Sequence, residues 1–196
     1  MSDVGQDNEF KEKWVYIMTK LLKKGLHLNI VHNLNRPINE MLLVLENWIP
    51  VYMTGSITPY YLKTPPLNFF NCSLCTSGSV ALSSECLRYN EKKSMFYLTT
   101  KNDEVKFKQE QAKIMLSKAT PLMNIYKETD KATFEKFMNK KENQNIQKIE
   151  KDIFKNIDFY INEDKWVVIN KKTSPEMHFV IYHEKLINAI KAFLLS

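Results

Sequence analysis

The sequence predicts an α/β fold that ends in a C-terminal β-meander and a closing helix. Two observations carry this prediction. Residues 28–61 read as a strand, a helix and a second strand, which together form a β-α-β unit. Residues 157–182 contain three short strand patterns separated by turn residues. The 196 residues include 44% hydrophobic residues, enough for a substantial core, so we expect a folded chain and not a disordered one.

The first elements follow from the spacing of apolar residues. In residues 8–24 apolar side chains recur every three or four positions, which is typical of an amphipathic helix. Gly25 is suited to its C-cap. Residues 26–31 then predict a strand that leads into the polar segment 32–36.

A second helix and a second strand complete the β-α-β unit. Asn35 is suited to cap this helix, Pro37 is tolerated in its first turn, and Pro50 ends it. Residues 57–62 predict a short strand, in which Pro59 indicates an edge or irregular position.

The middle of the chain predicts a hairpin, a strand and a helix. Residues 69–75 and 80–84 read as two strands around a turn at Ser77-Gly78, where Gly78 can supply a positive φ. A further strand is expected at 94–100 and a helix at 103–118.

The last third divides into a charged segment and an apolar one. Residues 127–156 are rich in Lys, Glu and Asn and predict one or two solvated amphipathic helices. The meander and closing helix follow at 157–161, 165–170, 177–182 and 184–195. We therefore expect an α/β core over 1–126, a helical charged connector over 127–156, and a meander with its helix, packed on the same body, over 157–196.

Charge and hydropathy restrict the partners and the compartment. The net charge is +6, from 28 basic and 22 acidic residues, but the only arginines are Arg36 and Arg88. Arginine supplies the bidentate contacts typical of nucleic-acid recognition, so a lysine excess favours a solvated surface. The N-terminus is polar, and no apolar run reaches the roughly 20 residues that span a bilayer. We expect a cytoplasmic protein without membrane contact.

No pattern predicts a metal, a cofactor or a catalytic residue. Cys72 and Cys75 have the spacing of a zinc half-site, but a strand places them on opposite faces. The same reasoning separates His178 from His183. No nucleophile elbow, P-loop or dinucleotide-binding glycine pattern is present.

Polar and aromatic residues gather around the β-α-β unit, where α/β sheets commonly bind ligands beyond the carboxyl ends of their strands. Arg36, near a helix N-terminus, is suited to bind an anion. The candidate ligand-binding residues are His32, Arg36, Glu40, Tyr52, Tyr60 and Tyr61. Three alternatives stay open: His32 is a turn residue without function, Arg36 pairs with Glu40 four residues on, and Tyr52 packs with Trp48 in the core.

The segment 28–61 resembles the effector region of helix-turn-helix transcriptional regulators, mostly of Firmicutes. The residues that carry the resemblance are His32, Arg36, Glu40-Met41, Trp48, Pro50, Tyr52, Gly55 and Pro59-Tyr60-Tyr61. The resemblance implies a homodimer that senses an unknown small molecule or protein partner. It also implies DNA contact only through an N-terminal helix-turn-helix, which this chain lacks.

A second resemblance is to a phospholipase D-like half-domain, with a mixed sheet flanked by helices. Phe70, Cys72 and Ser77 stand where such enzymes place the His, Lys and Asp of their catalytic motif. A phospho-histidine mechanism requires that nucleophile, so we expect no enzyme activity. The sequence therefore predicts a non-catalytic sensing domain of a bacterial regulator. The alternative is a stand-alone basic protein that binds or inhibits a nucleic-acid-handling complex.

Overall fold

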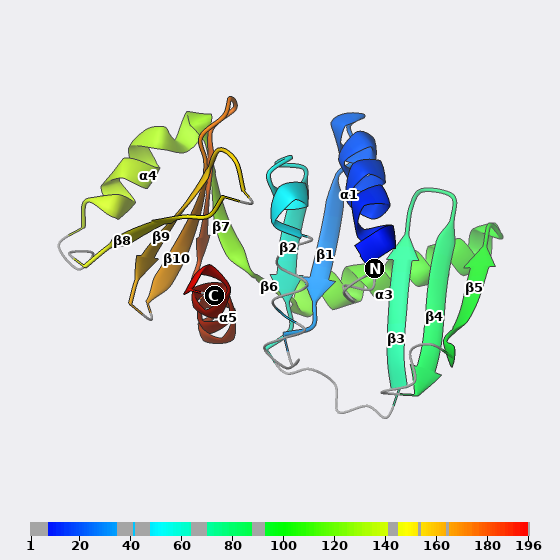
Figure 1. Ribbon diagram of the computed structural model, residues 1–196. Helices are drawn as coiled ribbons and strands as arrows, with labels where there is room; N and C mark the ends of the chain where they lie inside the picture. Colours follow the sequence, from blue (N-terminus) through cyan, green and yellow to red (C-terminus); the bar gives the residue numbers. More distant parts are fainter. Residues whose placement is uncertain are drawn as a thin grey trace. The chain divides into compact units, whose positions relative to one another are not determined.

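The computed structural model is a mixed α/β structure with several sheets and helices (Figure 1). It describes residues 8–34, 41, 48–63, 70–87, 93–140, 145–152, 154–163 and 165–195. These residues form two compact units. The first contains residues 30–33, 60–63, 70–87 and 93–120, and the second contains the described residues before 30, from 34 to 59 and after 120.

The first elements agree with the predicted helix and strands. Helix α1 spans Asn8–Lys23, and Gly25 follows it with φ +93°, as expected of a C-cap glycine. Strand β1 spans Leu28–His32 and strand β2 spans Ile57–Tyr61. Together with β6, Thr120–Pro121, they form a three-stranded sheet in the order β1-β2-β6. Residues 48–52 are helical, so the helix does not end at Pro50 as predicted, whereas Asn35 and Pro37 lie outside the described residues. Strand β2 has a neighbour on each side, so the edge position suggested by Pro59 is wrong.

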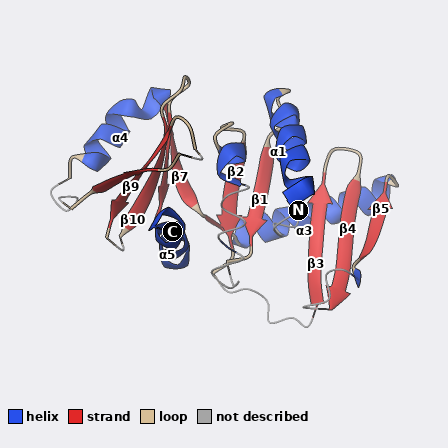
Figure 2. Cartoon of the chain, in the orientation of Figure 1, coloured by secondary structure: helices blue, strands red, loops and turns tan. Residues whose placement is uncertain are grey.

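A second three-stranded sheet forms the main part of the first unit (Figure 2). Strands β3 (Phe70–Thr76), β4 (Ala81–Leu87) and β5 (Met95–Thr99) are antiparallel neighbours in that order. Helix α3, Asn102–Lys118, packs on β3 and β4. The helix is fixed to the sheet by Tyr97, whose hydroxyl donates to Glu104, 2.7 Å away, and by Gln109, which donates to the carbonyl of Ser77.

The second unit contains a five-stranded antiparallel sheet in the order β7-β11-β10-β9-β8. The meander is confirmed as β9 (Ile157–Asn162), β10 (Trp166–Lys171) and β11 (Met177–Ile181). Strand β7, Met123–Lys127, pairs with β11, and β8, Gln147–Glu150, pairs with β9.

Two helices cover opposite faces of this sheet (Figure 1). The closing helix α5, Glu184–Leu195, buries six apolar residues on the side where the ring of Phe154 packs, tilted, against those of Phe159 and Phe193 at centroid distances of 6.0 and 5.8 Å. On the other face, Phe134 and Phe137 of helix α4, Lys131–Met138, pack on a core of Trp166, Val168 and Val180. A short 3-10 helix, η2 (Glu128–Asp130), precedes α4.

Three further sequence predictions need correction. The helical pattern predicted over 127–156 is wrong for β8, because pairing with β9 decides the conformation there in place of helix propensity. Gly78 has no positive φ, so the β3–β4 turn does not need a glycine for this reason. His183 lies beyond the end of β11 at Ile181, so it does not share that strand with His178.

Candidate functional site

The carboxyl ends of β1 and β2 meet at one edge of their sheet. The backbone N–H of Leu28 donates to the carbonyl of Ser56 at 3.0 Å, and His27 Nε2 lies 3.0 Å from the Thr58 hydroxyl. The two strands therefore begin side by side and run parallel, as their arrows in Figure 1 show. His32 and Tyr61, their last residues, consequently lie at the same edge. This is the position where α/β sheets bind ligands.

Three of the predicted site residues lie at this edge, within the first unit. The side chain of His32 is buried, while those of Tyr60 and Tyr61 are half-buried. An imidazole can donate and accept hydrogen bonds, and each phenol combines an apolar ring with a polar hydroxyl. We call these three residues the strand-end site: they share the strand ends, although Tyr60 and Tyr61, as neighbours in β2, point to opposite faces of the sheet.

The other predicted residues do not add to the strand-end site. Tyr52 belongs to the second unit, where its buried ring lies 5.8 Å from that of Trp48. Packing with Trp48, one of the alternatives from the sequence, therefore accounts for Tyr52. Arg36 and Glu40 lie outside the described residues.

A charged cluster on the five-stranded sheet was not predicted from the sequence. The carboxylate of Asp158 is buried on β9, with Lys172 Nζ 2.7 Å from Oδ1 and Lys148 Nζ 3.3 Å from Oδ2. The contact with Oδ1 lacks hydrogen-bond geometry, so we treat it as an ion pair. Glu150 joins the cluster, 2.7 Å from Lys148 and 3.5 Å from Lys172.

The four charges of this cluster stabilise one another. Hydrogen bonding to Glu150 and then to Asp158 raises the pKa of Lys148, and Asp158 raises the pKa of Lys172. Lys148 lowers the pKa of Glu150. Two cations therefore balance two anions, which indicates a structural role for the cluster. The only signal in the sequence is a single aspartate between Ile157 and Phe159 in an apolar strand.

His178 occupies the same sheet face as Asp158, because Asn170 of β10 pairs with both residues. Its ring stacks on Phe134 of α4 at a centroid distance of 3.7 Å and an interplanar angle of 4°. The Nδ1 atom is buried without a hydrogen-bond partner. Burial lowers the pKa of His178, and Lys131 lowers it further against the opposing effect of Glu176. The neutral ring therefore holds α4 on the sheet.

The described cysteines and acidic groups do not form a metal centre: no group of three or more His, Cys, Asp or Glu side chains that could hold a metal occurs in the part of the chain that the structure describes. Cys72 pairs with Glu85, and Cys75 with Leu82, across the hairpin. Cys75 is exposed and free.

Comparison with known protein families, with curated proteins and with solved structures finds no match to this chain. Among the described helices, none combines the length and the apolar character needed to cross a membrane. The function of the candidate site is therefore inferred from the positions and the chemistry of its own residues.

Proposed function

We propose that the chain is a non-catalytic, ligand-sensing effector domain of a bacterial transcriptional regulator, with its ligand bound at the strand-end site. The observation that carries this proposal is the parallel pairing of β1 and β2, which brings His32, Tyr60 and Tyr61 to one edge. The resemblance of residues 28–61 to regulator effector regions supports the same assignment. A ligand acts as a signal only if it binds one conformation of the protein more tightly than another.

The lack of catalysis is proposed from the β3–β4 hairpin. In a degenerate phospholipase D-like fold, this hairpin would carry the catalytic motif, but the corresponding positions hold Phe70, Cys72 and Ser77. None of these residues can replace a nucleophilic histidine with its lysine and aspartate partners. Phosphodiester hydrolysis by the pure protein, abolished by His32→Ala, would overturn this part of the proposal.

Transcript profiling tests the regulatory role. The encoding gene would be deleted and then complemented with wild type, with Tyr60→Ala/Tyr61→Ala, or with the control Tyr16→Ala, which removes an exposed tyrosine of α1. We expect wild type and the control to restore a set of transcripts that the double variant does not restore. A deletion that leaves transcription unchanged would contradict the regulatory role, and full rescue by the double variant would contradict the site.

The net charge of +6 favours a second candidate, a basic protein that binds a nucleic-acid-handling complex. Binding to a polyanion weakens steeply with salt, because counterions are released when the charges meet. Affinity for single-stranded or double-stranded nucleic acid that falls by orders of magnitude between low and physiological salt would support this candidate over the sensor.

A further inference from the structure

Strand β5 is an edge strand with an unusual number of exposed apolar side chains. Among the described strands it pairs only with β4. Its first four residues are exposed on both faces: Met95 by 78%, Phe96 by 66%, Tyr97 by 51% and Leu98 by 65%. An exposed, apolar edge of this kind is a template for pairing with another strand.

None of the usual protections of an edge strand is present in β5. The strand contains no charged residue, proline or glycine, and its register with β4 is continuous from Glu85↔Met95 to Ala81↔Thr99. The charged residues nearest to it in sequence, Lys93 and Lys101, lie beyond its two ends, while Glu85 pairs with Met95 on the inner side of the strand and Glu104 bonds to the Tyr97 hydroxyl from α3. A charge, a proline or a bulge is what normally prevents edge-to-edge pairing.

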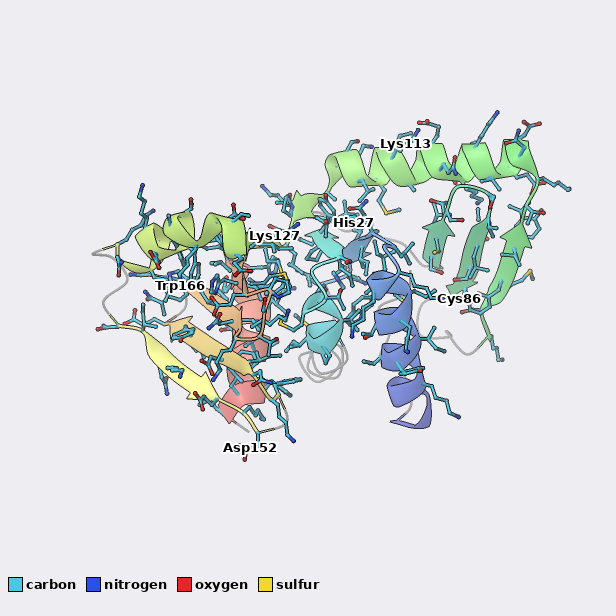
Figure 3. All side chains as sticks on the ribbon, turned by 90° about the horizontal axis from the view of Figure 1, so that it is seen from above. His27, Cys86, Lys113, Lys127, Asp152 and Trp166 are labelled. Atoms are coloured by element: carbon cyan, nitrogen blue, oxygen red, sulfur yellow. The ribbon has the colours of Figure 1, made fainter. Side chains whose placement is uncertain are left out.

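The sheet face opposite α3 continues this apolar surface. Residues paired across antiparallel strands share a face, so Leu98 lies beside Leu82 and Cys75, and Phe96 lies beside Ser84 and Ser73. Tyr97 is on the other face, because its hydroxyl bonds to Glu104 of α3. Figure 3 shows α3 on one side of this sheet and Cys86 on the other.

The sheet and its helix bury few of the side chains whose burial the structure describes. Among residues 73–87 and 93–120, the buried ones are Ala81, Thr99 and Val105. Small units with few buried side chains are usually completed by additional contacts. The exposed face and edge of β5 are where those contacts are available.

We propose that β5 pairs antiparallel with β5 of a second copy of this chain, which joins two three-stranded sheets into one of six strands. A two-fold axis sets the uncharged segment 95–99 against itself, so no like charges oppose each other within it. Beyond the segment, the same register sets Lys93 of one copy opposite Lys101 of the other, and Glu104, whose carboxylate lies 3.2 Å from Lys101 Nζ, is the anion beside these two lysines. Hydrogen bonds from Thr99, Tyr97 and Lys101 lower the pKa of Glu104 to about 2, so this partner is ionised.

Pairing with a second copy requires no other protein to provide a matching strand. Each copy presents the same apolar β5, and the sheet faces that carry Phe96 and Leu98 become continuous across the new strand pair. The association does not depend on the strand-end site, so it would persist if that site bound no ligand.

Sedimentation analysis tests the proposal with a matched pair of variants. Phe96→Lys places a charge in the pairing strand, whereas Phe107→Lys changes an equally exposed phenylalanine, 61% exposed, on α3. Over about 1 to 100 µM, a range that brackets a micromolar Kd, we expect dimers for wild type and Phe107→Lys. We expect dimerisation of Phe96→Lys to be at least about tenfold weaker. A wild-type monomer throughout this range would overturn the proposal, as would equal dimerisation of the two variants.

Cysteine cross-linking tests the geometry. Single cysteines at positions 95 to 99, in a background with Cys72, Cys75 and Cys86 replaced by serine, would be oxidised after circular dichroism shows native folding. Residues opposite each other in an antiparallel pair have Cα atoms about 4.5–5.5 Å apart, within disulfide range. Rapid cross-linking at the one position on the two-fold axis would support β5 self-pairing. Equal cross-linking at all five positions, or at none, or a one-to-one complex with a different protein over β5, would overturn it.

Discussion

Replacing Gly55 by alanine tests how the turn after residues 48–52 is fixed to the C-terminal sheet. Gly55 has φ +72°, and an added Cβ would lie 2.7 Å from Sδ of Met177 on β11. A left-handed conformation costs an L-residue about 1–2 kcal/mol, and overpacking typically costs about 1–3 kcal/mol. Because the end of the Met177 side chain is flexible, we expect the variant to lower the free energy of unfolding by about 2–4 kcal/mol in total.

Two other glycines separate backbone strain from the clash. Gly25 has φ +93° but no atom within 4 Å of an added Cβ, so Gly25→Ala should cost about 1–2 kcal/mol. Gly78 has neither a positive φ nor a neighbour, and its substitution should stay within about 0.5 kcal/mol. In a Met177→Ala background, Gly55→Ala should cost only as much as Gly25→Ala does in wild type.

Urea unfolding followed by tryptophan fluorescence is the appropriate assay. Trp14, Trp48 and Trp166 all belong to the second unit, which also contains Gly25 and Gly55. Circular dichroism would follow Gly78→Ala, which lies in the first unit. If Gly55→Ala and Gly25→Ala destabilised equally, the contact with Met177 would carry no free energy. A neutral Gly25→Ala would refute the backbone argument itself.

Two further predictions concern the polar groups of the second unit. Asp158→Ala removes a buried carboxylate that faces two lysines, and it should lower the free energy of unfolding in urea by about 1–3 kcal/mol. Glu150→Ala removes an exposed partner of the same lysines and should lower it clearly less. Equal losses for the two variants would contradict a central role for Asp158. Burial depresses the pKa of His178, so below about pH 6.5 the unfolded chain takes up a proton that the folded chain does not, and stability falls as the pH decreases. His178→Phe should keep the stack on Phe134 and reduce this loss of stability between about pH 7 and 5. Burial also lowers the pKa of His183, so His183 would account for the pH dependence of stability that remains in the variant. An unchanged pH dependence would exclude His178 as the residue responsible.

The spacing of apolar residues predicted the secondary structure correctly wherever the face that is apolar in the sequence is also the face that is buried in the fold. The spacing of Met18 and Leu22 in α1 reflects one buried face, whereas the nearly continuous apolar runs of β9 to β11 reflect burial on both faces of their sheet. The exposure of Ile17 and Leu21 on the same helix α1 was not predictable, because periodicity indicates an apolar stripe but not which part of it is covered.

Strand β8 and the exposed edge β5 show what sequence patterns cannot reveal. Gln147–Glu150 becomes a strand because β9 offers an edge and Asp158 offers a partner for Lys148, and both conditions come from distant parts of the chain. The segment 95–99 reads as an ordinary buried strand, since its position at the edge depends on the order of the sheet.

Of the candidate ligand-binding residues, the sequence correctly indicated which ones lie at strand ends but not which one lies in the core. His32, Tyr60 and Tyr61 follow strand ends, and parallel pairing of adjacent strands brings such residues together. Tyr52 was included because it is close in sequence, but its helical segment buries the ring against Trp48. Proximity along the chain did not distinguish a residue at the strand ends from a residue of the core.

Native mass spectrometry of the freshly purified chain tests the central claim most directly. Wild type should carry an additional mass that denaturation releases, which would give the mass of the ligand at the strand-end site. Tyr60→Ala/Tyr61→Ala should lose this mass, while Tyr16→Ala, exposed on α1, should retain it. A bare wild-type chain, or a bound mass that the double variant retains fully, would contradict ligand sensing at the ends of β1 and β2.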